Sequence, residues 1–184
     1  MVLNESILRK DKMSFVQVYE NEPYEDERGF LSKFVSLNET LQGKAFPTAE
    51  VFRSKTNIGF VRGMHFQNGD SSNTRLIHLM SGHIVTYFID LRTESKTFGE
   101  IDRLETPPHI SRTFFVPAGI AHGYYAIKDS EVLYLSDKAH VPNEDLGVNP
   151  LSEEFQWPST PRGISKRDAA LPTLRSYLDS ITNR

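Results

Sequence analysis

The chain has 184 residues, and 21 lysines and arginines stand against 24 aspartates and glutamates, which gives a formal net charge of −3. This length is typical of one domain with a substantial core, and we expect residues 1–184 to form a single domain. Because the chain has no excess of positive charge to neutralise a phosphate backbone, the composition argues against nucleic-acid binding. The absence of cysteine excludes disulfides and thiolate chemistry, and it is typical of a reducing compartment.

The hydropathy of the chain gives no sign of a membrane segment. The first residues, Met1 to Ser6, are polar, and no run approaches the roughly 18 consecutive apolar residues of a membrane span. Together with the missing cysteines, this predicts a cytoplasmic protein without a membrane partner.

Short strand-like segments follow one another along the chain. They recur at 15–19, 30–34, 50–52, 59–66, 76–80, 83–91, 113–117, 123–127 and 131–135. Turn-forming residues separate most of them, and a charged turn occupies 21–29. Many short strands with such turns favour a β-sandwich or barrel over alternating strands and helices. Near the end, Leu174, Tyr177, Leu178 and Ile181 recur at helical spacing, which predicts a short helix beginning near Pro172.

Two histidines stand beside glycines in strand-like segments that lie far apart in the sequence. His65 belongs to the segment RGMHFQ (62–67), and His122 belongs to VPAGIAHG (116–123). Imidazole side chains in general titrate near neutral pH, so a pocket in which these two converge would suit proton transfer. Strand alternation places Arg62 and His65 on opposite faces unless the strand bends at Gly63. The pattern alone leaves a structural, hydrogen-bonded histidine equally open.

The spacing around His122 resembles the second motif of cupins, which are small barrel proteins that hold a metal or an organic ligand inside. Metal-binding cupins supply two histidines and a glutamate from their first motif, whereas here that region offers His65, and His78 and His83 are out of register. A complete metal site needs more ligands. The resemblance therefore implies an all-β cupin-type jelly roll, a double-stranded β-helix barrel with short C-terminal helices, and no metal or other cofactor. A metal-dependent cupin oxygenase remains an alternative.

Six segments, in order, resemble motifs of the dTDP-4-dehydrorhamnose 3,5-epimerases, the metal-free cupins of nucleotide-sugar biosynthesis. They are DERGF (26–30), RGMHFQ (62–67), DLRTESKTFG (90–99), FVPAGIAHG (115–123), EVLY (131–134) and SKRD (165–168). The resemblance implies an isomerase that epimerises a nucleotide-diphosphate-linked 4-keto-6-deoxy sugar at carbon 3, carbon 5 or both. A sugar ketoisomerase and a non-catalytic nucleotide-sugar-binding cupin are the alternatives.

The resemblance also implies a catalytic trio. His65 would remove the proton beside the ketone, Asp168 would orient its ring, and Tyr134 would return a proton from the other face. A carboxylate on the second ring nitrogen fixes the tautomer of a histidine base. From the local pattern alone, Ser165 and Asp168 are equally typical of a capping box that opens a helical turn, and Tyr134 is typical of a core tyrosine.

A substrate-binding shell and a homodimer are implied in the same way. The shell comprises Tyr24, Arg28, Glu50, Arg62, Gln67, Arg75, His122 and Arg167. Arg28 would hold the diphosphate through its planar fork, although a surface ion pair in a turn is the simpler interpretation. Arg62 would lie near the enolate or the diphosphate, and His122 would support the pocket or polarise the ketone. Tyr24 would stack on the base across a dimer interface, or be an exposed turn residue.

Several binding-shell positions differ from the pattern that this family usually has. Arg75 stands where a lysine is usual, and Thr86 where an acidic residue is usual. Glu50 and Phe52 replace a polar pair, and Ala139 replaces a tyrosine that stacks on the base. An arginine is not a neutral substitute for a lysine. These differences leave the nucleotide, the sugar and the inverted carbon open.

Overall fold

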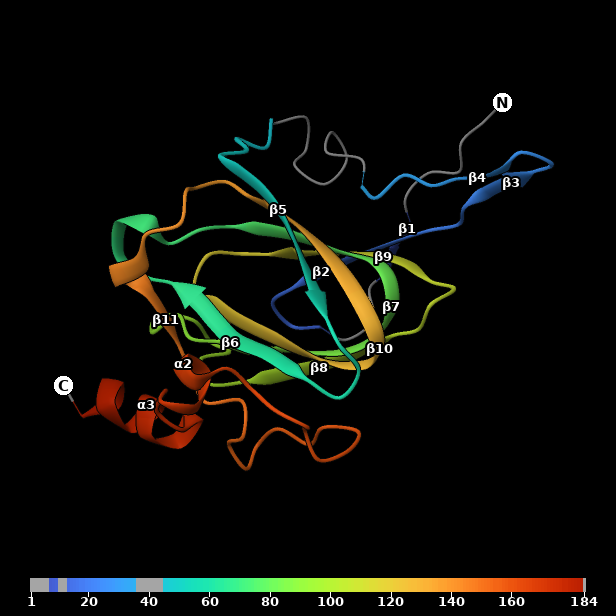
Figure 1. Ribbon diagram of the computed structural model, residues 1–184. Coiled ribbons are helices and arrows are strands. Elements are labelled where there is room, and N and C mark those ends of the chain that lie inside the picture. The colour runs from blue at the N-terminus through green and yellow to red at the C-terminus, as the bar shows by residue number, and fades with distance from the viewer. Residues whose placement is uncertain (1–6, 10–12, 36–44, 184) are drawn as a thin grey trace.

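Strands dominate the described part of the chain (Figure 1). The computed structural model describes residues 7–9, 13–35 and 45–183. The strands are β1 (Ile7–Arg9), β2 (Gln17–Asn21), β3 (Tyr24–Asp26), β4 (Gly29–Leu31), β5 (Glu50–Thr56), β6 (Val61–Gln67), β7 (Arg75–Asp90), β8 (Ile101–Thr106), β9 (Ser111–Val116), β10 (Ile120–Ser136) and β11 (Asp145–Gly147). The helices are η1 (Gly69–Ser71), η2 (Pro142–Glu144), α2 (Lys166–Ala169) and α3 (Leu174–Thr182). Within these described ranges, no helix is long and apolar enough to cross a membrane.

Two long strands, β7 and β10, pair with each other and belong to both layers of the fold. The first part of β7 pairs with β9 and its second part with β8. The first part of β10 pairs with β6 and its second part with β5. One layer therefore has the order β1-β2-β9-β7-β10-β5, and the other has the order β8-β7-β10-β6-β11. This is the all-β jelly-roll barrel that the sequence predicts.

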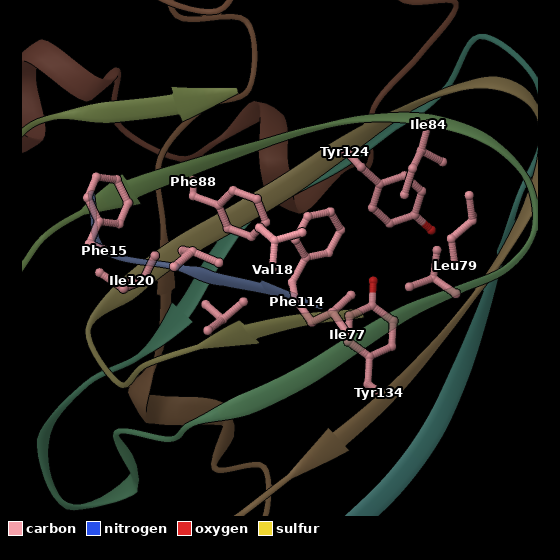
Figure 2. Close-up of a cluster of buried hydrophobic side chains, with 13 residues drawn as sticks. Phe15, Val18, Ile77, Leu79, Ile84, Phe88, Phe114, Ile120, Tyr124 and Tyr134 are labelled. Atoms are coloured by element: carbon pink, nitrogen blue, oxygen red, sulfur yellow. The ribbon is translucent and has the colours of Figure 1, made fainter. Parts of the chain in front are cut away.

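An apolar core fills the space between the layers. Its members come from both layers, and they include Val18, Ile77 and Phe114 from one and Ile84 and Phe88 from the other. Figure 2 shows Phe15 at one end of this core and the two tyrosines, Tyr124 and Tyr134, toward the other end. The apolar side chains thus close one part of the barrel, and the tyrosines mark where its interior becomes polar.

A second core lies on the outer face of the layer with the order β8-β7-β10-β6-β11. Alternate residues of β7, such as Val85 and Tyr87, point to this face and pack with Leu174 of α3. Tyr177 and Leu178 pack against the same cluster, which confirms three positions of the predicted apolar stripe. Because both faces of the second part of β7 are covered, residues 84–90 are buried without alternation.

The predicted and observed strands differ in ways that burial explains. The segments 76–80 and 83–91 form one strand, as do 123–127 and 131–135, because the chain bends without leaving the sheet. The register between β10 and β7 shifts between Ala126 and Val132, at the bend. The sequence did not predict β1, β3, β8 or β11. Of these, β3 is a short exposed strand and β8 is mostly partly exposed, so neither of the two carries a clear buried face.

The backbones of β6 and β10 approach each other closely at a pair of glycines, Gly63 and Gly123. A Cβ on Gly123 would lie 2.6 Å from the carbonyl oxygen of Arg62 and 3.0 Å from the Cα of Gly63. Gly63 has a φ of 116°, which side chains disfavour. The register between the two strands shifts between His122 and Tyr124, next to this contact. The glycine pair therefore permits the spacing at which His65 and His122 are paired across the strands.

Replacement of Gly123 by alanine is expected to destabilise the fold. The new methyl group would collide with backbone atoms that cannot rotate away, and such overpacking costs about 1–3 kcal/mol. Urea unfolding of Gly123→Ala measures this loss. Gly99→Ala is the matched control, because its Cβ would meet nothing nearer than 3.6 Å and only its φ of 81° is unfavourable. A Gly123→Ala variant no less stable than Gly99→Ala would contradict the close approach.

The buried imidazole of His78 makes stability depend on pH. It is 4% exposed, stacks on Phe34 with 3.8 Å between ring centroids, and its Nδ1 lies 2.8 Å from the Thr113 hydroxyl. Since that hydroxyl donates its proton to the Phe34 carbonyl, Nδ1 is the donor to it. Burial lowers the pKa of His78 to about 4.

Stability is therefore expected to fall in mild acid. Between pH 6.5 and pH 4 the unfolded chain binds a proton at position 78 that the folded chain does not, so unfolding is favoured as pH decreases. This titration should lower the free energy of unfolding by about 3 kcal/mol between pH 6.5 and pH 4, and it should have no effect above pH 6.5. Urea unfolding at several pH values should give a flatter profile for His78→Gln. The exposed His109 supplies the control, since His109→Gln should keep the wild-type profile. Equal slopes in all three proteins would refute this account.

Candidate active site

A cavity of about 600 Å³ opens between the two layers of the barrel. Residues from β5, β6, β7, β10 and the turn before α2 line it. Seven of the residues that the sequence analysis selects share this lining: Arg62, His65, Arg75, His122, Tyr134, Arg167 and Asp168. The structure therefore brings together segments that are up to about a hundred residues apart in sequence.

The central pair of the cavity is His65 and Asp168. Nε2 of His65 lies 2.6 Å from Oδ1 of Asp168, and the Asp168 side chain is only 4% exposed. Ser165 caps α2, because its hydroxyl accepts a hydrogen bond of 3.0 Å from the backbone N–H of Asp168. The two interpretations of this segment are thus compatible: Ser165 forms the cap, while the carboxylate of Asp168 points to the histidine.

The charge of Asp168 decides which atom of His65 is basic. Burial by itself raises the pKa of this carboxyl group, but the hydrogen bond and charge of His65, the Ser165 hydroxyl and Arg167 outweigh it and lower the pKa. The ionised carboxylate accepts the proton on Nε2, which leaves the lone pair on Nδ1. The basic atom of His65, which lines the cavity, is therefore Nδ1.

Tyr134 faces the cavity from β10, on the opposite layer from β6. Its side chain is buried, and its ring stacks on Phe52 of the neighbouring strand with 4.8 Å between centroids. Burial raises its pKa above the ordinary value and Tyr124 raises it further, while the hydrogen bond with Ser54 and the charges of Arg75 and Arg62 offset only part of this. The phenol therefore keeps its proton at neutral pH and can act as a proton donor.

Several buried polar atoms on β7 and β10 have no hydrogen-bond partner. Among the described residues they include Nε of Arg75, Nδ1 of His122 and Oγ1 of Thr86. Burial lowers the pKa of Arg75, and burial together with the charges of Arg75 and His65 holds the pKa of His122 well below its usual range. His122 is consequently neutral at physiological pH. Buried donors are normally satisfied, so Arg75 and His122, which line the cavity, are suited to bind a polar group of a ligand.

Two further arginines add positive charge to the cavity wall. Nε of Arg62 donates to the Thr56 hydroxyl (2.7 Å), and its Nη2 donates to the carbonyl of Lys55 (2.9 Å). Arg167 is held by Asp145 through an ion pair of 2.8 Å. Arg62 and His65 both line the cavity, although simple alternation along β6 separates them, because the strand is irregular at Gly63.

Four residues expected in the binding shell lie outside this cavity. Gln67 is 1% exposed; its amide nitrogen donates to the carbonyls of Ser71 and Ala139, and its oxygen accepts from Val141 N. These bonds use both amide hydrogens of Gln67 and connect two loops outside the cavity, so its expected substrate-binding role has no support from the lining of the cavity.

Glu50 lies in an adjoining hollow of about 480 Å³. This hollow shares Phe52 and Arg75 with the main cavity, so these two residues form the boundary between the two spaces. One carboxylate oxygen of Glu50 accepts a hydrogen bond from the backbone N–H of His140.

Tyr24 and Arg28 belong to the β3–β4 hairpin, which projects away from the barrel (Figure 1). Arg28 forms an exposed ion pair with Asp26 at 2.5 Å, which is the simpler of the two interpretations of this arginine. Neither residue lines the cavity of its own chain.

A polar group on the β5 side of the cavity was not predicted from the sequence. The Tyr124 hydroxyl lies 2.6 Å from the hydroxyl of Thr56 and 2.9 Å from that of Ser54. Positions 52, 54 and 56 alternate along β5, so this strand periodicity was the available signal. In the part of the chain that the structure describes, no group of three histidine, aspartate or glutamate side chains is arranged to hold a metal ion.

Comparisons with known proteins agree with this geometry. The sequence model of the dTDP-4-dehydrorhamnose 3,5-epimerase family matches residues 11–176. The Salmonella typhimurium dTDP-4-dehydrorhamnose 3,5-epimerase is 30% identical over 180 residues, covering 94% of this chain and 97% of that protein. The Bacillus anthracis enzyme of the same name, solved with TDP and PPi bound, has a TM-score of 0.83 and 27% identity, over 91% of this chain and 98% of that one. A 4-keto-6-deoxy sugar epimerase from Streptomyces spheroides has a TM-score of 0.85 and 25% identity, over 98% and 94% of the chains. The family match spans most of the chain and includes the His65, Tyr134 and Asp168 segments, so the chain belongs to the dTDP-4-dehydrorhamnose 3,5-epimerase family.

Proposed function

We propose that this protein epimerises a nucleotide-diphosphate-linked 4-keto-6-deoxy sugar at a carbon next to the ketone. The observation that carries this proposal is the shared cavity, in which a carboxylate-oriented histidine and a neutral tyrosine lie on different layers of the barrel. Inversion at carbon needs two proton carriers on opposite faces of the sugar ring, and this arrangement supplies both.

The reaction begins with proton removal by His65. A ketone makes the neighbouring C–H bond acidic because the electron pair that is released moves onto the ketone oxygen. Nδ1 of His65 takes the proton, and the imidazolium that forms is stabilised by the ionised Asp168 at 2.6 Å. The product of this step is an enolate whose negative charge is on oxygen.

The enolate oxygen is assigned to Arg75 and His122. Both have buried nitrogen atoms without partners, and Arg75 is positively charged. Preorganised donors of this kind contribute roughly 3–4 kcal/mol each to such a transition state.

Tyr134 completes the inversion from the other side. Its phenolic proton passes to the carbon, the carbonyl reforms, and the phenolate regains a proton from solvent while His65 releases one. The raised pKa of Tyr134 ensures that the proton is present at the start of each turnover.

The nucleotide diphosphate is assigned to the positively charged wall. The cavity is lined by Arg62, Lys55 and Arg167. The planar guanidinium group of an arginine can donate two parallel hydrogen bonds to phosphate oxygens. We assign dTDP as the first nucleotide to test, since the related Bacillus anthracis structure contains TDP. Tyr24 and Arg28 are proposed to act on the substrate of a second copy of this chain, because their hairpin projects from its own barrel and exposes Phe30 at 74%. The proposed functional unit is therefore a homodimer.

The experiment is incubation with dTDP-4-keto-6-deoxyglucose in deuterium oxide, with CDP- and GDP-linked analogues in parallel. NMR of the product should show deuterium and inverted configuration at carbon 3, carbon 5 or both, with the carbonyl still at carbon 4. A carbonyl at a different carbon would identify a ketoisomerase instead. Tight binding of the nucleotide sugar without deuterium uptake would identify a binding protein and refute the epimerase proposal.

A further inference from the structure

Phe52 and Tyr134 form an aromatic pair at the wall of the cavity. The two residues are direct partners in the β5–β10 ladder, and both line the cavity. Their rings are nearly parallel, at 7°, with 4.8 Å between centroids. We propose that Phe52 is a positioning residue that holds the Tyr134 phenol over the reacting carbon, and so determines how often deprotonation ends in inversion. This inference rests on the proposed epimerase function.

Two neighbours on β5 position Tyr134: the Ser54 hydroxyl forms a hydrogen bond with the phenol, and Phe52 stacks on the ring. The other aromatic neighbour of its ring, His122, is farther away, at 6.3 Å and tilted by 40°. Tyr134 also belongs to the apolar core that contains Ile77 (Figure 2). Phe52 covers the face of the ring, and a flat aromatic contact restricts its tilt.

Phe52 is also unusually exposed for a residue with an aromatic partner in the interior. It is 40% exposed, while Tyr134 is 7% exposed. It stands between the main cavity and the adjoining hollow that contains Glu50. The fold therefore does not need Phe52 to fill its core, and its large ring is available to shape the tyrosine side of the cavity.

The two proton carriers are held by independent elements. Asp168 and α2 orient His65 on β6, whereas Phe52 on β5 orients Tyr134 on β10. A change at Phe52 should consequently disturb proton return without disturbing proton removal.

An enolate that Tyr134 does not protonate takes a proton back from His65 on the original face. The His65 side chain is 26% exposed, so its proton can exchange with solvent before it returns. In deuterium oxide this return places deuterium on the carbon with the original configuration retained. The ratio of deuterium exchange to inversion therefore reports the position of the phenol. A loss of stability or of substrate affinity lowers both rates together and leaves this ratio unchanged.

The test compares exchange and inversion in Phe52→Leu, Phe52→Met and Phe52→Tyr, each incubated with dTDP-4-keto-6-deoxyglucose in deuterium oxide. Leucine and methionine keep an apolar side chain but lack the flat ring. Inversion should fall roughly 10-fold in both, well short of the about 100-fold loss that a 1 Å displacement can cause, and exchange should stay within about twofold of wild type. Phe52→Tyr keeps the flat ring at a position that is 40% exposed, so it should retain the wild-type ratio.

Met80→Ala is the matched control, because Met80 is an apolar strand residue that is 50% exposed and lies outside both spaces. It should behave as wild type. Parallel loss of exchange and inversion in the leucine and methionine variants, or no change in either, would overturn the positioning role of Phe52. A wild-type protein that incorporates no deuterium would overturn the proposed function itself, together with this inference.

Discussion

Replacement of His65 by asparagine is expected to abolish both deuterium exchange and inversion. Asparagine can still hydrogen-bond to Asp168, but it has no basic nitrogen, so no group on this face of the sugar can take the proton. General-base catalysis contributes about 10²–10⁴-fold, and the rates of both processes should fall by this amount. The measurement is the initial rate of deuterium uptake next to the ketone, followed by NMR.

The control for His65 is another histidine outside the cavity. His109 is exposed and does not line the site, so His109→Asn should retain both rates. Equilibrium binding of dTDP should be preserved in His65→Asn. Unchanged exchange in His65→Asn would show that the base is a different residue.

Replacement of Tyr134 by phenylalanine is expected to separate the two processes. The phenylalanine ring can keep its stack on Phe52 but has no proton to give. Inversion should fall by about 10²–10⁴-fold, as expected for the loss of a general acid, whereas exchange through His65 should change by less than about threefold. The measurement is product configuration and deuterium content in the same sample.

Two outcomes would contradict this assignment of Tyr134. Retained inversion would mean that another acid protonates the enolate. A matched loss of exchange and inversion would mean that Tyr134 takes part in proton removal or substrate binding instead of proton return.

The proposed catalytic pair shows what the sequence can predict and what it cannot. The motif resemblance selected His65 and Asp168, which are 103 residues apart and in contact. Strand alternation placed Arg62 on the opposite face from His65, yet both line the cavity. The cause is the close contact of Gly63 with Gly123 and the register shift beside it, which no hydrophobic period encodes.

The two long strands illustrate a different limit. Gly82 and the polar residues near Ser130 are typical of turns, and the sequence therefore predicted separate strands on either side of them. In the structure, β7 and β10 continue through these residues because each remains paired with the other across the bend. Long-range pairing of this kind overrides local turn preference.

The binding shell was the least predictable part of the site. Arg28 and Gln67 have the chemistry of substrate ligands, and the sequence could not predict that Arg28 lies on an exposed hairpin and that Gln67 joins two loops. In the sequence, Phe52 differs from the usual family pattern only in residue type. Its stack on Tyr134 depends on the register of β5 with β10, which the sequence does not show. Residue type suggests a contact, but only the three-dimensional arrangement decides whether the contact is made.

The most direct test of the central claim is a single incubation series in deuterium oxide that compares wild type, His65→Asn and Tyr134→Phe. If His65 and Tyr134 act from opposite faces of the sugar, wild type exchanges and inverts, Tyr134→Phe exchanges without inverting, and His65→Asn does neither. Exchange by His65→Asn at the wild-type rate would contradict the account, because the proton would then be leaving through a group other than the His65–Asp168 pair.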